Sequence, residues 1–266
     1  MKIQPLRHSD IGQLKELQPP DWNDITPHFK YYIDSPYSNP VKIVSENKIT
    51  GIGTTIKNKD SAWLAHIIVH PEYRNKGLGK KITDALVKSI DRRKYKTIYL
   101  IATKLGYPVY LKSRFELEGE YAHFNIEPGK YKSNISPNII PFKEIHRTQI
   151  LKLDQFVTGE FREIRLSKHI LNSFVFFKNG KVSGVYFPTL ADGMIIADSD
   201  VAGIELIKLR MMEKENAIFP KENKTAFDFY RKADFKLIQY SKRMILGKKR
   251  IRHPRNMFNR ISGGLG

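Results

Sequence analysis

The stretch AWLAHIIVHPEYRNKGLGKK, residues 62–81, decides the fold of the first part of this chain. Residues 63–69 are mostly apolar and rich in β-branched side chains, which predicts a strand buried on both faces. Pro71 ends that strand. The apolar positions that follow keep the spacing of one helix face; they are Leu78, Ile82, Ala85, Leu86 and Ile90. The segment is therefore expected to form a strand, a tight turn and a helix.

The turn before that helix, RNKGLG at residues 74–79, has the composition of an anion site. Two glycines let the backbone turn tightly and approach a ligand closely. The start of a helix presents unpaired N–H groups and the positive end of its dipole. Positive charge is added by Arg74, Lys76, Lys80 and Lys81. The turn therefore predicts a site for a diphosphate, whereas the alternative, a plain strand–helix turn, would need only one glycine.

The two halves of the chain resemble each other. Residues 3–6 (IQPL) match residues 139–142 (IIPF), and each run is followed by the pattern of an amphipathic helix. A strand–turn–strand pattern follows in both halves, at residues 41–56 and 173–187; the second has an Asn-Gly turn. Later, YLKSRF at 110–115 matches YRKADF at 230–235. An internal repeat with its boundary at Pro128–Pro137 is therefore expected, with domains 1–128 and 138–266.

Each half reads strand, helix, hairpin, strand, helix, strand, helix, strand, which predicts a mixed α/β sheet with helices on its faces. The second half lacks the glycine turn. Its strand at residues 193–197 leads to the next helix through Asp198-Ser199-Asp200. Two carboxylates at this place would repel a diphosphate. One anion site per chain is therefore expected, in the first half.

Composition limits the classes of function. The chain has 266 residues and a net charge of +19, from 46 Lys and Arg against 27 Asp and Glu, which favours an anionic partner. The absence of cysteine excludes disulfides, a cysteine nucleophile, thiolate zinc sites and iron–sulfur clusters. Basic residues concentrate between Lys242 and Arg260, where two interpretations stay open: a phosphate or nucleic-acid contact, and a solvated basic edge. The start of the chain is not expected to be a signal peptide, and no apolar stretch is long enough for a membrane helix.

The pattern Arg-x-x-Gly-x-Gly after the strand end VHPEY resembles the acetyl-CoA signature of the GNAT N-acetyltransferases. Arg74, Gly77 and Gly79 fill its three places, and Tyr110 and Phe115 match the helix tyrosine and strand aromatic found later in that family. Arg114 departs from the family pattern, which usually has glycine before the phenylalanine. The resemblance covers about residues 1–125. The arrangement of halves is similar to a bacterial subfamily in which a degenerate GNAT-like half follows the active one.

The resemblance implies an α/β fold of two tandem GNAT-like mixed sheets flanked by helices, the second degenerate, with acetyl-CoA as cosubstrate. The backbone of Ile67, Ile68 and Val69 would pair with the pantetheine amides, and the Val69 N–H would stabilise the oxyanion. The diphosphate would be held by Arg74 and by the amides of Asn75, Lys76, Gly77, Leu78, Gly79 and Lys80. The amine would attack directly in a ternary complex, and Tyr110 would protonate the departing thiolate. His66 is a candidate general base; a packed histidine and an ordered water chain are the alternatives.

The acceptor is expected to be a small-molecule amine first and a protein lysine second, because clefts of two-domain proteins commonly hold small ligands. Candidate acceptor contacts are the acids Asp192, Asp198, Asp200 and Glu160 and the aromatics Phe187, Phe161, Trp22 and Tyr32. Two other functions stay open: a basic nucleic-acid-associated protein, and a CoA-binding regulatory module without turnover. The eight histidines show no metal-ligand spacing. No membrane partner and a cytoplasmic location are expected.

Overall fold

The computed structural model describes residues 2–20, 22–128 and 134–266. By its internal contacts the chain divides into two compact units. The first comprises Met1–Leu117, Met244–Lys248 and Gly263–Leu265, and the second comprises Glu118–Arg243, Lys249–Ser262 and Gly266. The division differs from the expected ranges 1–128 and 138–266 in two ways: the residues from Glu118 onward belong to the second unit, and short segments from late in the chain complete the first. Of the expected boundary, residues 129–133 lie outside the described residues.

The sheet of the first unit has the order β1-β2-β3-β4-β5, followed by the end of β12. The strands are β1 (Lys2–Pro5), β2 (Ser38–Ser45), β3 (Lys48–Lys57), β4 (Ser61–Val69), β5 (Thr97–Ala102) and β12 (Lys236–Gly247). The neighbours from β1 to β4 are antiparallel, and β4 and β5 are parallel. Glu46 and Asn47 join β2 to β3 with φ of 51° and 62°, the geometry of a tight hairpin turn. The hairpin expected at residues 41–56 is confirmed.

Helices cover both faces of this sheet. They are η1 (His8–Leu17), α1 (Thr26–Asp34), η2 (Pro71–Tyr73), α2 (Leu78–Lys88) and α3 (Tyr107–Lys112). Alternate residues of a strand point to opposite faces: Trp63 of β4 packs with the core beneath η1 and α1, and Leu64 packs with the core beneath α2 and α3. The helix α2 agrees with its prediction. The first expected amphipathic helix, in contrast, is the 3-10 helix η1.

Two glycines of β3 let α2 approach the sheet closely. A Cβ added at Gly51 would come within 2.8 Å of the Ile82 Cδ1, and one at Gly53 within 2.9 Å of the Ile82 Cγ2. Real Cβ atoms are not found at such separations, so a side chain at either position would require Ile82 to shift. At Gly53, Leu86 and Ile67 also lie within 3.1 Å, so this position has the stronger need for glycine. The helix that begins at the glycine turn is thereby fixed against the strands beside β4.

The second unit contains a sheet of order β13-β10-β9-β8-β7 and a group in which β6 lies between β12 and β11. The strands are β6 (Glu116–Asn125), β7 (Ile139–Pro141), β8 (Phe174–Lys178), β9 (Lys181–Phe187), β10 (Met194–Ala197), β11 (Asn216–Pro220) and β13 (Met257–Asn259). The β8–β9 turn has Asn179 and Gly180 at φ of 51° and 76°, as the Asn-Gly pair predicts.

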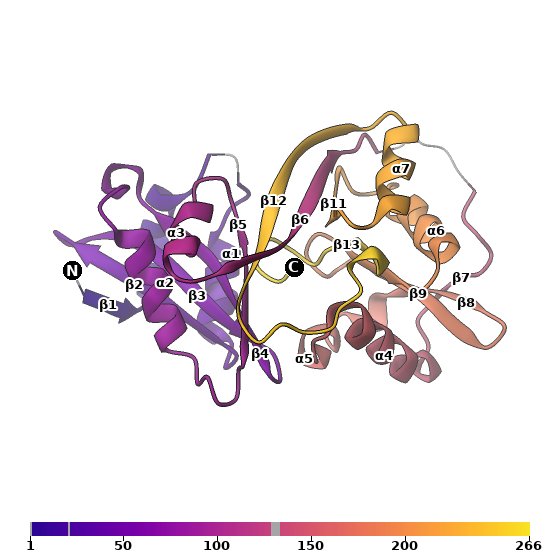
Figure 1. Cartoon of the computed structure of the whole chain (residues 1–266), viewed down its shortest axis with the longest axis horizontal. Coiled ribbons are helices and arrows are strands. Elements are labelled where there is room, and N and C mark those ends of the chain that lie inside the picture. The colour runs from indigo at the N-terminus through magenta and orange to yellow at the C-terminus, as the bar shows by residue number, and fades with distance from the viewer. Residues whose placement is uncertain (1, 21, 129–133) are drawn as a thin grey trace. The chain divides into compact units, whose positions relative to one another are not determined.

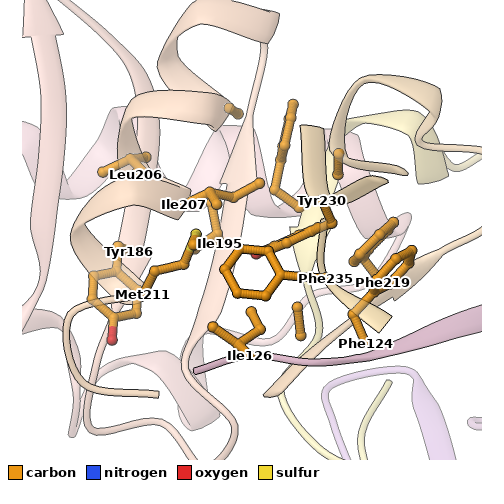
Figure 2. Packing of buried hydrophobic residues seen from close by; sticks show 14 of the residues in the cluster. Phe124, Ile126, Tyr186, Ile195, Leu206, Ile207, Met211, Phe219, Tyr230 and Phe235 are labelled. Atoms are coloured by element: carbon orange, nitrogen blue, oxygen red, sulfur yellow. The ribbon is translucent and has the colours of Figure 1, made fainter. Parts of the chain in front are cut away.

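The helices of this unit are η3 (Glu144–His146), α4 (Arg147–Thr158), α5 (Glu163–Leu166), η4 (Ile170–Asn172), α6 (Asp200–Arg210), α7 (Lys224–Lys232) and η5 (Pro254–Asn256). The helices α6 and α7 lie side by side (Figure 1). Their core is aromatic: Figure 2 shows Phe124, Phe219 and Tyr230 packed together. These rings are stacked, with centroids 5.4–5.7 Å apart, which adds geometric specificity to the buried area.

The local structure around the repeated aromatic pair is the same in both halves. The rings of Tyr110 and Phe115 are 6.3 Å apart, and those of Tyr230 and Phe235 are 6.2 Å apart. The residue before each phenylalanine has a positive φ, 66° at Arg114 and 58° at Asp234. Arg114 therefore keeps the backbone shape that glycine would adopt without strain. The repeat predicted from the sequence is a repeat of structure.

Replacing Arg114 with glycine is expected to raise the free energy of unfolding by roughly 0.5–1 kcal/mol, because the left-handed backbone is unfavourable for every residue with a Cβ. Arg114 is exposed, so few contacts are lost. The check is chemical denaturation. Lys112→Gly, at an exposed helical position two residues earlier, is the matched control and should lower stability by about 1 kcal/mol. Destabilisation by both variants would contradict the argument.

Among the described residues, no helix has the length and apolar character that crossing a bilayer requires.

Candidate functional site

The two parallel strands β4 and β5 of the first unit pair over only part of their length. Ser61, Ala62 and Trp63 of β4 pair with Thr97, Ile98 and Tyr99 of β5. The strand β4 continues to Val69 and β5 to Ala102, beyond this register. The pairing of β4 with β5 therefore ends at Trp63. We call the stretch of β4 and β5 beyond this register the gap, because the β4 backbone there is not paired with β5 and a ligand can pair with it as an added strand would.

An irregularity in β4 lies at this gap. The register with β3 shifts between Ile52 and Thr54, and His66 has a φ of 48°. A non-glycine residue with positive φ inside a strand is uncommon and is characteristic of bulges near functional sites. The bulge redirects the three residues that follow, which are the predicted pantetheine contacts.

The Val69 N–H points away from β3. Val69 is opposite Gly51, and the next residue, His70, donates its N–H to the Thr50 carbonyl over 3.0 Å. In an antiparallel ladder this pattern makes Val69 and Gly51 a non-hydrogen-bonded pair, so the Val69 amide faces the gap. The Val69 carbonyl accepts a hydrogen bond from Arg74 Nε over 3.2 Å. The geometry is compatible with the predicted role of Val69 as a donor.

The glycine turn opens directly onto the start of α2. Asn75 and Gly77 both have left-handed backbones, with φ of 60° and 80°. The first helical hydrogen bond runs from the Lys81 N–H to the Gly77 carbonyl over 3.0 Å, so the preceding amides have no partner within the helix. A Cβ at Gly77 would meet nothing within 4 Å, and one at Gly79 would have only ordinary contacts, the nearest at 3.6 Å from Val109. The protein itself has no steric need for glycine at 79, whereas a closely bound anion does.

The basic side chains around the turn differ in whether an acidic group neutralises them. Arg74 and Lys76 are exposed, and the Lys76 ammonium lies 5.0 Å from the Tyr73 ring centroid. Lys80 forms an ion pair of 2.5 Å with Asp84. Of the predicted diphosphate contacts, Lys80 is therefore suited to contribute its backbone amide rather than its side chain.

Tyr110 lies in α3 and is buried in the core beneath α2. Burial raises the pKa of its hydroxyl well above the usual value, so the side chain stays protonated. This is the state a proton donor needs. Tyr230 in the second unit has the same ring geometry against Phe235, although that unit has no counterpart of the 74–79 turn before α6. The Tyr–Phe spacing alone therefore does not identify a catalytic group.

His66 is surrounded by aromatic rings of the first unit. Its ring centroid is 5.9 Å from Trp22, 5.0 Å from His28 and 5.8 Å from Phe29, and its Nδ1 lies 3.1 Å from the Tyr32 hydroxyl. Burial, and secondarily the charge of His28, lower the pKa of His66 to about 3. An imidazole with such a pKa is a weak base at neutral pH. These observations argue against His66 as the general base.

Of the predicted acceptor contacts, Trp22 and Tyr32 lie together around His66. His28 and Gly264 complete this group, and neither was predicted from the sequence. No local spacing singles out His28, and Gly264 is about 200 positions away from His66 in the chain.

The other predicted acceptor contacts belong to the second unit, where most have structural partners. Asp192 pairs with Arg260 over 3.1 Å and Asp198 with Lys181 over 2.5 Å. Glu160 is buried with Arg243 3.9 Å away. Phe187 is also buried, Phe161 is exposed, and Asp200 begins α6.

The second unit fills the place that corresponds to the gap. Its strands β10 and β11 lie in different sheets, and β13 pairs with β10. Beside β13, the Asn259 Oδ1 accepts the Ile218 N–H of β11 over 2.8 Å, and the Arg260 N–H donates to the Ile218 carbonyl. A Cβ added at Gly203 of α6 would overlap the Phe258 ring. At the start of α6, Ser199 Oγ already accepts the Ala202 N–H.

The basic cluster between Lys242 and Arg260 is largely used within the second unit. Arg243 and Arg260 are only 3% and 7% exposed. Arg243 and Arg252 both pair with Glu118, over 2.5 Å and 3.5 Å. The prediction of a solvated basic edge is therefore wrong for these arginines. Because they are paired within the protein, fewer basic side chains of the cluster are available to contact nucleic acid. Among the described residues, no group of three or more acidic or histidine side chains is placed to hold a metal ion.

Comparison with known proteins agrees with this geometry. Residues 21–125 match the family described as "Acetyltransferase (GNAT) domain". A putative acetyltransferase from Pyrococcus horikoshii has a similar structure over 100% of this chain and 95% of its own, with a TM-score of 0.83 and 18% identity. A tandem GNAT protein from the clavulanic acid biosynthesis pathway is similar over 92% of this chain and 98% of its own, with a TM-score of 0.63 and 12% identity. A GCN5-related N-acetyltransferase from Sphaerobacter thermophilus is similar over 94% of this chain and 96% of its own, with a TM-score of 0.63 and 11% identity. No curated protein matches the sequence.

Proposed function

We propose that this chain, whose residues 21–125 match a GNAT acetyltransferase domain, transfers an acetyl group from acetyl-CoA to an amine. The observation that carries the proposal is the combination, in one unit, of the gap beside β4 and the glycine turn at the start of α2. A small-molecule amine is the acceptor expected first. The absence of cysteine suits a reducing compartment, so a cytoplasmic location is part of the proposal.

The cosubstrate would be held by backbone groups more than by side chains. The diphosphate would accept hydrogen bonds from the amides of residues 75–80, where the helix dipole favours negative charge. Arg74 borders this site and is also tied to the Val69 carbonyl. The pantetheine arm would lie along Ile67–Val69 and pair with the edge of β4 that faces the gap.

The proposed reaction is a direct displacement. The amine nitrogen attacks the acetyl carbonyl carbon, a tetrahedral oxyanion forms, and the C–S bond then breaks. The Val69 N–H would donate to the oxyanion, a contribution of about 3–4 kcal/mol per donor in acyl transfer. Tyr110 would give its proton to the departing thiolate, and the proton lost by the amine would pass to water.

Calorimetry should detect one acetyl-CoA per chain. In the first unit the glycine turn precedes α2 and the pairing of β4 with β5 ends at Trp63, whereas in the second unit β13 lies beside β10 and Ser199 caps α6. The same preparation should then release thiol from acetyl-CoA when primary amines are supplied in a panel.

The outcomes separate the competing functions. Binding of two acetyl-CoA molecules per chain would contradict the single site. Binding without thiol release for any amine would favour a CoA-binding regulatory module. Absence of binding, together with salt-dependent retention of duplex or single-stranded nucleic acid, would favour the nucleic-acid alternative.

A further inference from the structure

Three residues near the end of the described chain, Gly263–Leu265, belong to the first unit. Gly264 is buried against the β4 bulge. A Cβ added there would lie 3.0 Å from the Ala65 Cβ, 3.8 Å from the Tyr32 hydroxyl and 3.9 Å from His66 Nδ1. The glycine backbone therefore rests on the β4 bulge at Ala65 and His66, which follows the last β4 residue that pairs with β5.

The segment is held by packing and by its own hydrogen bonds. Leu265 packs against the core beneath η1 and α1, which includes Trp63 and Tyr99, the last residues to pair before β4 and β5 separate. The Ile261 N–H donates to the Gly266 carbonyl over 3.0 Å, and the Gly266 N–H donates to the Ser262 carbonyl over 3.1 Å. Residues 263–265 thus form the tip of a closed loop.

This loop tip lies on the face of the sheet opposite the glycine turn. The helix that follows the turn packs with Leu64, and the loop tip packs with the core that contains Trp63 and Ala65. Neighbouring residues of a strand point to opposite faces. A cosubstrate that reaches the gap from the α2 face leaves the other face for the amine.

We propose that residues 263–265 are an acceptor-side cover, which blocks approach to the thioester in the resting chain and moves aside when an acceptor enters. The inference rests on the proposed function for the identity of the reaction. It adds that access to the site is controlled by a segment distant in sequence, rather than by the residues of the GNAT domain alone.

Two variants test the cover. Leu265→Asp places a carboxylate in a partly buried apolar position, and removal of residues 263–266 eliminates the loop tip altogether. Leu171→Asp is the matched control, because Leu171 is 67% exposed in the second unit. Circular dichroism verifies that each variant folds.

The first measurement needs no cosubstrate. The pKa of His66, about 3 in the intact chain, is followed by the NMR titration of its imidazole. Exposure of the His66 ring should raise its pKa by at least one unit in either cover variant. The polar groups that face the ring from α1, His28 and Tyr32, are the same residues in every variant, so the change would come from the loop. The Leu171→Asp control should leave it unaltered.

The second measurement uses acetyl-CoA alone, with water as the acceptor. Thiol release by hydrolysis should rise at least threefold in the cover variants, with the acetyl-CoA dissociation constant within twofold of the parent value. If neither the His66 pKa nor hydrolysis changes in the folded variants, the proposal is overturned.

A fall in hydrolysis with binding intact also overturns the proposal, because the segment would then be part of the reactive site and not a cover. If the intact chain does not bind acetyl-CoA at all, the proposed function fails. The His66 titration then decides by itself whether the loop shields this face.

Discussion

Gly79→Glu is expected to weaken acetyl-CoA binding at least a hundredfold, about 2.7 kcal/mol, without loss of the fold. The new carboxylate would stand at the start of α2, where the diphosphate is proposed to bind, and would both repel it and occupy its place. The helix itself tolerates the change. The Cβ has only ordinary contacts, glycine is a poor helix former, and an acid in the first turn is favourable by about 0.3–1 kcal/mol.

The affinity for acetyl-CoA should therefore fall while the free energy of unfolding does not, which distinguishes a lost ligand contact from a damaged protein. Calorimetry gives the dissociation constant, and chemical denaturation gives the free energy of unfolding. The matched control is Thr225→Glu, which puts the same side chain at the second residue of α7 in the other unit. It should leave acetyl-CoA affinity unchanged. Equal affinity in the Gly79→Glu variant would remove the glycine turn from the binding site.

The features predicted from the sequence are those encoded within a few consecutive residues. The apolar run of β4, the glycine turn and the helical spacing after Gly77 all agree with the structure because each depends on local patterns. The Asn179-Gly180 turn was predicted for the same reason. The left-handed backbone at Arg114 was accessible only through the family pattern, since arginine has no preference for it.

The features that escaped prediction depend on contacts between distant parts of the chain. The sequence names His66 as a candidate base, but its lowered pKa results from rings of α1 and the loop before it. Gly264 rests on Ala65, and β13 pairs with β10. No local periodicity encodes such pairings. Consequently the local structure on the proposed cosubstrate side, a strand, a turn and a helix, could be predicted from the sequence, whereas the packing around His66 could not. The contacts of these residues with a cosubstrate stay a prediction.

Tyr110→Phe is expected to lower kcat about a hundredfold, within the usual range for loss of a general acid, while the dissociation constant of acetyl-CoA stays within twofold. The substitution keeps the ring in its buried position and removes only the proton that the thiolate would receive. Steady-state kinetics with the best amine of the panel, together with calorimetry, measures both quantities.

The repeat supplies a control that few enzymes offer. Tyr230 has the same ring geometry against Phe235 and a pKa that burial likewise raises, but it belongs to the unit without a glycine turn. Tyr230→Phe should leave kcat unchanged. If the two variants have equal effects, Tyr110 is a packing residue in both copies and the proton comes from elsewhere.

The pH profile gives an independent test of the same residue. Because burial disfavours the charged form, the pKa of Tyr110 lies above the ordinary value of 10.0. The Tyr110 hydroxyl therefore stays mostly protonated up to about pH 10, and kcat of the parent chain should show no alkaline decline from this group below that pH. A decline centred near pH 8 that disappears in Tyr110→Phe would mean that the hydroxyl ionises readily, which is incompatible with a donor buried as the structure has it.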